Sequence, residues 1–214
     1  MKKVYWVIIA SLIAAGITVA IILYVRSGFK RKLIHVANEE VKKWKGLTEL
    51  SQNASKYLLD YWKTVGINFI PSQMQNANVQ DNYPWSSAFI SYLFERAGAK
   101  DKFPYARSHS GYFQVAKKNR HNTNAYLRGF RVNEYAPKVG DLVVYSREAG
   151  KGYDSEGHFA SHGELVIEQG NGYIKTVGGN VSNTAKESTF KTDANGFLTG
   201  NPVAFFMVIQ NNIT

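Results

Sequence analysis

The spacing of apolar residues changes near residue 140, and this change limits the fold classes open to the chain. Before that point, apolar residues recur every three or four positions, as they do on one face of an α-helix. After it, short runs rich in Val, Ile, Tyr and Phe are separated by Gly, Asn and Asp, as in strands joined by turns. Helices followed by a curled antiparallel sheet predict an α+β domain.

The helical half divides into several segments. We predict helices over residues 33–45, 48–65 and 85–97, followed by a fourth that Ser108 caps. Glycine follows each of the first three, as is typical of helix ends. The polar stretch 67–84, bounded by Pro71 and Pro84, predicts a long loop beside the site. Beyond it, β-prone runs lie at 140–145, 162–168, 173–177, 188–191 and 203–209.

An uncharged apolar run occupies residues 4–25. As a helix, its roughly 22 residues reach about 33 Å, enough to cross the hydrocarbon core of a bilayer. The run ends without the small residues of a signal-peptide cleavage site, so we predict an uncleaved transmembrane helix. The chain then divides into an anchor with its juxtamembrane link, 1–32, and a soluble domain, 33–214. Basic residues flank both ends of the run, so the positive-inside rule does not fix its orientation.

The composition limits the chemistry and the partners. The net charge of +10 creates a positive field that favours polyanions such as wall polymers, anionic lipid or nucleic acid. The basic residues are spread along the chain and match no nucleic-acid-binding motif, so we predict no nucleic-acid partner. Because the chain has no cysteine, neither disulfides nor thiol chemistry are open to it.

Ser86 is the candidate nucleophile. It lies in the first turn of the helix predicted over 85–97, where the helix dipole and free N–H groups stabilise a developing anion. A serine needs a base, and His162 at the beginning of a β-prone run is the candidate. Glu164 shares its strand face because side chains alternate with period two. The same spacing also fits a Ser86 that only caps a helix and a His162 that only begins a strand.

A metal site is the alternative. His109, His162 and Glu164 provide two imidazoles and a carboxylate, a set that zinc accepts together with a water in an open fourth position. That water could attack an amide in place of a side chain. The chain contains no His-Glu-x-x-His run, and no cofactor is needed for the serine route. Asp141, between Gly140 and Leu142, is predicted to order a turn at a strand entrance.

Three motifs resemble those of cell-wall hydrolases of the CHAP (cysteine- and histidine-dependent amidohydrolase/peptidase) and NlpC types. Residues 84–92 resemble their Trp-Cys-Ala-x-Phe-Val-Ser-Trp segment, with Ser86 in the cysteine position. Residues 162–166 resemble their His-Val-x-Ile-Val strand. Gly179-Asn180 resembles the Gly-Asn step that presents a third polar group. This resemblance implies a papain-like, NlpC-type fold in which Ser86, His162, Glu164 and Asn180 are catalytic.

The chain more closely resembles a bacterial family of uncharacterised function that is related to those hydrolases. Its five motifs occur here in the same order at 84–91, 106–112, 136–143, 162–166 and 178–181. The resemblance covers roughly 33–209, and ordered motifs are more specific than any single one. Serine is usual in this family at the position of Ser86. Glu164 departs from the family motif, in which aspartate is common at this position.

Together these features predict a membrane-anchored peptidoglycan hydrolase. It would cut an amide bond of the stem peptide or cross-link, with its domain in the periplasm and its anchor in the bacterial inner membrane. A looser resemblance to wall hydrolases that accompany type VI secretion systems suggests an envelope-machine partner. The alternative is a non-catalytic module that binds peptidoglycan or a partner protein, which the missing thiol favours. Binding of nucleic acid or anionic lipid through net charge is a third reading.

Overall fold

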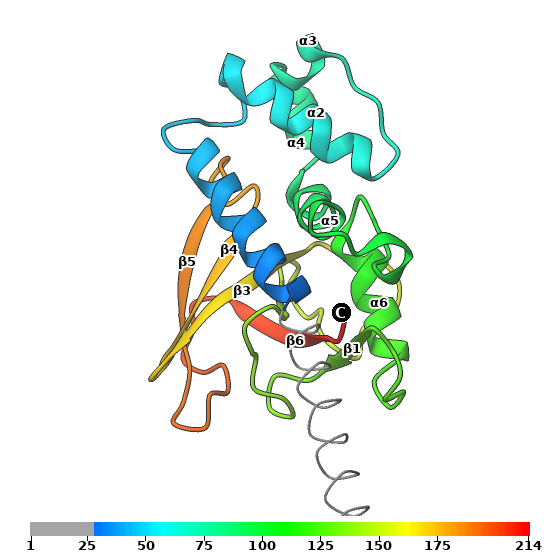
Figure 1. Ribbon diagram of the computed structural model, residues 1–214, viewed down its shortest axis with the longest axis vertical. Helices are drawn as coiled ribbons and strands as arrows, with labels where there is room; N and C mark the ends of the chain where they lie inside the picture. Colours follow the sequence, from blue (N-terminus) through cyan, green and yellow to red (C-terminus); the bar gives the residue numbers. More distant parts are fainter. Residues whose placement is uncertain (1–27) are drawn as a thin grey trace, which may run out of the picture.

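A computed structural model of the chain describes residues 28–214, and these form an α+β domain (Figure 1). Its helical elements are residues 28–43, η1 Gln52–Ala54, α2 Ser55–Thr64, α3 Pro71–Met74, α4 Ala77–Asn82, α5 Ser86–Ala97, η2 Lys100–Lys102 and α6 His109–Lys118. Its strands are β1 Leu127–Phe130, β2 Leu142–Ser146, β3 Ser161–Gly170, β4 Tyr173–Gly178, β5 Lys186–Lys191 and β6 Ala204–Asn211. Helices followed by an antiparallel sheet confirm the α+β part of the predicted fold class.

The predicted anchor at 4–25 lies outside the described residues. Within 28–214, no helix has both the length and the apolar character needed to cross a membrane. The helix predicted over 33–45 begins at residue 28 and ends at residue 43, so it starts within the segment predicted to link anchor and domain.

One local prediction was wrong, and one strand was not predicted. The stretch 67–84 is not one long loop, because it contains α3 and α4. Pro71 begins α3, and the Asn76 side chain caps α4 by accepting a hydrogen bond from the Asn78 N–H at 2.9 Å. Such short helices show no apolar periodicity, so polar cap residues are all that the sequence displays. The four-residue strand β1 was also missed.

The six strands form one antiparallel sheet in the order β1-β6-β2-β3-β4-β5. Strand β3 lies inside the sheet, between β2 and β4. Its register places His162 opposite Tyr145, and Gly163 opposite Val144. Because β3 is paired on both sides, the residues that it presents to the helices occupy fixed positions.

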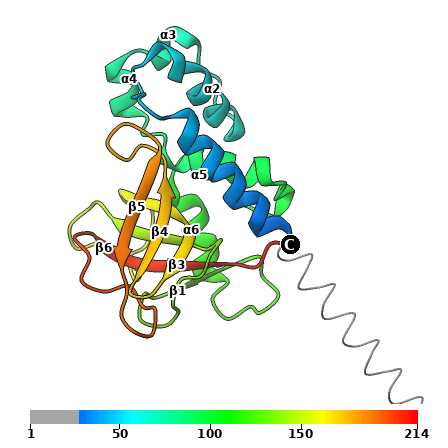
Figure 2. The same cartoon turned by 60° about the vertical axis from the view of Figure 1, so that its left-hand side comes forward.

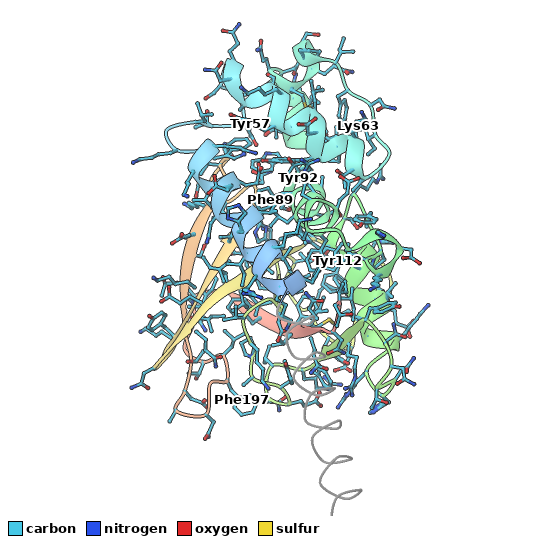
Figure 3. All side chains as sticks on the ribbon, in the orientation of Figure 1. Tyr57, Lys63, Phe89, Tyr92, Tyr112 and Phe197 are labelled. Atoms are coloured by element: carbon cyan, nitrogen blue, oxygen red, sulfur yellow. The ribbon has the colours of Figure 1, made fainter. Side chains whose placement is uncertain are left out.

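Helices α2, α3 and α4 gather at one end of the molecule, whereas α5 and α6 lie beside the sheet (Figures 1 and 2). Aromatic side chains join these layers. The ring centroids of Trp44 and Trp85 are 4.6 Å apart in a stacked arrangement, and Trp85 donates its indole N–H to Glu49 at 2.8 Å. Phe89 and Tyr92 of α5, labelled in Figure 3, contact Tyr61 of α2. This packing fixes the position at which α5 begins.

Asp141 has the structural role predicted for it. Its buried carboxylate accepts backbone N–H groups from Lys138 at 2.9 Å and Asn211 at 3.0 Å. It also pairs with Lys30 of the helix 28–43, at 3.3 Å. Burial raises the pKa of Asp141, although the Lys30 charge and the two N–H groups oppose that change. One carboxylate therefore joins the helix 28–43, the entrance to β2 and the end of β6.

Replacing Asp141 with alanine should lower the free energy of unfolding by about 2–4 kcal/mol, because it leaves a buried N–H and a lysine unpaired. The matched control is Asp154→Ala. The Asp154 carboxylate also pairs with an arginine, Arg131, but the Asp154 side chain is 76% exposed. That change should cost far less, because an ion pair on an exposed side chain is screened by water and contributes little to stability. Urea unfolding followed by tryptophan fluorescence measures both. Equal losses for the two variants would contradict the proposed role of Asp141.

Candidate active site

Ser86 and His109 form a hydrogen-bonded pair at the beginning of two helices. Ser86 is the first residue of α5 and His109 the first of α6. The Ser86 Oγ lies 2.7 Å from the His109 Nε2, and the residues are only 5% and 4% exposed. A serine hydroxyl bonded to an imidazole is the arrangement needed to remove its proton during nucleophilic attack.

The amino end of α5 provides free hydrogen-bond donors around Ser86. Trp85 occupies the N-cap position without a side-chain cap, and the first turn is closed by Phe89 N donating to Trp85 O at 2.9 Å. No backbone acceptor is found within 28–214 for the N–H groups of Ser86, Ser87 or Ala88. A helix N-terminus with unpaired N–H groups stabilises an oxyanion that forms beside it.

Two further serines of α5 position the helix that carries His109. Ser87 donates to the carbonyl of Ala106 at 2.8 Å, and Ser91, one turn later, exchanges hydrogen bonds with the backbone of Ala106. Ala106 lies three residues before His109, so these contacts fix the start of α6 against α5. The roles of the neighbouring hydroxyls therefore differ, because Ser86 contacts the imidazole and Ser87 contacts the backbone.

The other ring nitrogen of His109 contacts Tyr112. The two residues are three positions apart on α6, and the His109 Nδ1 is hydrogen-bonded to the Tyr112 hydroxyl. Gly163 of β3 allows this packing, because a Cβ there would lie 2.9 Å from the His109 Nδ1 and closer still to the Tyr112 hydroxyl. Tyr112 is fully buried, and burial raises its pKa well above the ordinary value, so its phenol keeps its proton.

His162 lies behind His109 instead of beside Ser86. The two imidazole centroids are 5.4 Å apart, and His162 is fully buried. Its Nδ1 lies 3.0 Å from the Arg147 guanidinium, which can only donate, so the Nε2 carries the proton of the neutral ring. That Nε2 lies 3.6 Å from Glu164 Oε1 and has no hydrogen-bond partner among the described residues.

Glu164 and Asn180 lie farther from the hydroxyl of Ser86. Glu164 accepts hydrogen bonds from Thr176 at 2.6 Å and Tyr145 at 3.5 Å, and its burial raises its pKa. Asn180 follows β4 with a left-handed backbone, φ 56°. In the part of the chain that the structure describes, neither residue is hydrogen-bonded to Ser86 or His109. The structure thus places His162 next to Glu164, and Ser86 next to His109.

Both histidines are neutral at pH 7. Burial lowers the pKa of His109 to about 3, and the nearby charge of Arg147 lowers it further in the same direction. Burial likewise lowers the pKa of His162 well below its ordinary value, with His109 and Arg147 adding to the effect. A neutral imidazole can accept a proton from Ser86, although its low pKa makes it a weak base.

Two tautomers satisfy the hydrogen bonds of His109. With the proton on Nδ1, the ring donates to Tyr112 and its Nε2 accepts the proton of Ser86. With the proton on Nε2, the ring donates to Ser86 and accepts from Tyr112. Only the first tautomer activates the hydroxyl, because the second leaves no free lone pair facing it.

A pocket of about 220 Å³ opens in front of the pair. Its walls include Ser86 and His109 together with Arg107, Arg147 and Phe159. A second cavity of about 560 Å³, lined in part by Trp62 and Tyr83, shares Pro84, Arg107 and Ser108 with the first as walls. The site therefore offers a small polar pocket next to a larger, partly aromatic one, which suits an extended ligand.

A metal-binding arrangement is not found in this part of the fold. Across residues 28–214, no group of three or more histidine, aspartate or glutamate side chains is arranged to hold a metal ion. Of the alternative zinc ligands, His109 already bonds Ser86 and Tyr112, whereas Glu164 bonds Thr176.

Sequence reasoning did not identify the partner of Ser86. It assigned His109 only to the metal alternative, and it missed the contacts of Tyr112 and Arg147. A usable signal was present, because His109 and Tyr112 are spaced i, i+3 within the motif at 106–112 and so share one helix face. The direction in which that face points depends on how α6 packs against β3.

Gly163→Ala should destabilise the domain by about 1–3 kcal/mol, because the added methyl overlaps His109 and Tyr112. Gly152→Ala is the matched control, since a Cβ there meets its nearest atom at 3.7 Å. Thermal unfolding followed by circular dichroism compares the two variants. A Gly163→Ala protein as stable as the control would show that α6 does not pack so closely on β3.

Acid should destabilise the protein through His109. Between pH 6.5 and about 3, the unfolded chain binds a proton that the native imidazole excludes, so the free energy of unfolding falls as pH decreases. His109→Gln should flatten this dependence, whereas His121→Gln, at an exposed position, is the matched control. The raised pKa values of Asp141 and Glu164 increase the free energy of unfolding as pH decreases. Because both residues are present in every variant, their contribution cancels when the variants are compared. Identical pH slopes for the wild-type and His109→Gln proteins would contradict this assignment.

Comparison with known proteins identifies a family. The family model described as "Uncharacterized protein conserved in bacteria (DUF2272)" matches residues 51–205, a range that contains the whole site from Ser86 to Asn180. No curated protein and no solved structure matches the chain. Because the match spans well over half of the sequence, this protein belongs to that bacterial family.

Proposed function

We propose that this protein is a serine-dependent hydrolase that cuts an amide bond in the stem peptide or cross-link of peptidoglycan. The observation that carries the proposal is the hydrogen bond of 2.7 Å between the Ser86 Oγ and the His109 Nε2. The pair lies at the amino end of α5 and lines a pocket, so nucleophile, base and anion-stabilising donors occupy one place.

The chemistry follows from this geometry. Ser86 Oγ attacks the amide carbonyl carbon while its proton moves to the His109 Nε2. The resulting oxyanion accepts hydrogen bonds from the N–H groups of the first turn of α5. His109 then donates that proton to the leaving amine as the C–N bond breaks, which leaves an acyl group on Ser86. A water molecule, deprotonated by His109, attacks the acyl carbon, and Ser86 regains its proton when the acid product departs.

Tyr112 and His162 act as positioning residues in this scheme. Tyr112 accepts the Nδ1–H of His109 in the reactive tautomer and holds the ring toward Ser86. His162 packs behind the ring and holds Arg147 through its Nδ1. His162 thus acts through His109 and Arg147, and Glu164 lies behind it with Oε1 3.6 Å from the His162 Nε2. The sequence alone suggested a direct contact of His162 with Ser86.

Several features favour the cell wall as the location of the substrate. We propose that the protein is related to CHAP and NlpC-type hydrolases and has their papain-like fold. The packing of α5, which carries Ser86, against β3, which carries His162, supports this relation. The apolar run at 4–25 would anchor the chain in the bacterial inner membrane and leave the domain in the periplasm. The net charge of +10 favours an anionic wall polymer, and an envelope machine such as a secretion system is the proposed partner.

One observation favours a second function, a non-catalytic module that binds peptidoglycan or a partner protein. Among the residues described, the hydroxyl of Tyr112 has no hydrogen-bond partner other than His109 Nδ1. A buried hydroxyl that donates nowhere costs about 1–3 kcal/mol, so Tyr112 favours the tautomer in which His109 donates to Ser86. In that state the hydroxyl of Ser86 is not activated and can only bind a ligand.

The test is hydrolysis of purified sacculi by the full-length protein in detergent, with products identified by mass spectrometry. Ser86→Ala should lower the rate by about 10³-fold or more, because it removes the nucleophile. Ser55→Ala is the matched control, since this buried serine also begins a helix, α2, and lies outside the pocket. A fluorophosphonate probe should label the wild-type protein at Ser86.

The other outcomes separate the alternatives. Cleavage that a chelator abolishes and that survives in Ser86→Ala would support the zinc mechanism and refute the serine route. Binding of sacculi without products, in the wild type as in Ser86→Ala, would support the non-catalytic module.

A further inference from the structure

Two arginines form walls of the pocket in front of Ser86. Arg107 precedes α6 and Arg147 follows β2, and both are exposed residues that line the cavity of about 220 Å³. No aspartate or glutamate of the described chain lines this cavity or the neighbouring one of about 560 Å³. The pocket therefore has positive walls without an acidic group among them.

Neither guanidinium forms an ion pair with a carboxylate of residues 28–214. In the described structure, all ion pairs of arginine involve other residues, as between Arg131 and Asp154 or Arg120 and Glu134. Arg147 donates a hydrogen bond to the imidazole of His162 and also interacts with the hydroxyl of Tyr145, and both of these groups are neutral. Burial raises the pKa of Glu164 and the charge of Arg147 opposes this slightly, but Glu164 forms no ion pair with Arg147 and is hydrogen-bonded to Thr176. Both positive charges are thus available to a ligand.

We propose that the pocket binds a carboxylate of the substrate between Arg107 and Arg147, so that the protein acts on amide bonds next to an acidic residue. A guanidinium presents N–H groups in a planar fork that matches the two oxygens of a carboxylate. This inference rests on the proposed function for the bond that is cut, but the binding of the carboxylate does not depend on cleavage. The same pair of guanidinium groups can bind either a side-chain carboxylate or a terminal carboxylate of the substrate.

The site gives this carboxylate a second effect. Arg147 lowers the pKa of His109, so a negative charge bound to Arg147 offsets that influence and raises the pKa of the base. The acidic substrate then makes His109 better able to accept the proton of Ser86. A substrate without the carboxylate loses both the binding contact and this assistance.

The test uses three small probes that differ in charge. N-acetylglutamine carries only the α-carboxylate, N-acetylisoglutamine only the side-chain carboxylate, and N-acetylglutamine amide neither. Calorimetric titration of the full-length protein in detergent should show at least one acid binding about tenfold or more tightly than the diamide. The tighter of the two acids identifies which carboxylate the pocket accepts.

Arg107→Gln should reduce this preference to about twofold or less, because one guanidinium is lost from the pocket. Lys118→Gln is the matched control, since it removes the same charge from an exposed position outside both cavities. Equal affinity for acids and diamide, or no binding of any probe, would overturn the proposal. Equal losses in the two variants would also overturn it, because they would reveal only a general effect of net charge.

Cleavage assays keep the two proposals separate. If stem peptides are cut equally well with free and with amidated carboxylates, the anionic subsite is refuted and the hydrolase stands. If the acids bind through Arg107 and no peptide is cut, the subsite stands and the hydrolase is refuted.

Discussion

The close approach of α6 to the backbone of β3 is the contact on which the site depends. At Gly163 the strand has no side chain, so His109 and Tyr112 occupy the space that a Cβ would fill. The strand is paired on both sides, and the serines of α5 hold the backbone at Ala106. Ser86 and His109 therefore meet because two helix starts are fixed against one rigid strand.

Burial determines the electrostatic character of this centre. His109 and His162 are removed from water next to a guanidinium, so the charged forms of both rings are disfavoured. The positive charge lies instead on Arg147 and Arg107, at the wall of the pocket. A neutral base behind a cationic wall suits a substrate that brings its own negative charge. In the proposed hydrolase, this arrangement would connect recognition of the ligand to activation of the serine.

The sequence predicted some parts of the site and not others, for identifiable reasons. Ser86 could be chosen because a helix start follows from local pattern, and α5 begins at that residue. Asp141 could be assigned to a turn because its contact with Lys138 is local, whereas its contacts with Lys30 and Asn211 were not visible. His162 was paired with Ser86 because strand position alone gives no distance. The insertion of His109 between them depends on the packing of α6.

The sequence by itself determined that helices precede strands, that a helix predicted from residue 85 carries Ser86 in its first turn, and that thiol chemistry is absent, because these follow from local periodicity and composition. Tertiary structure decided which imidazole touches the serine, which arginines face the pocket and which carboxylate is buried behind them. The physical reason is that helix–sheet packing brings together residues that are far apart in the chain. At Gly163 that packing depends on the missing side chain of one glycine.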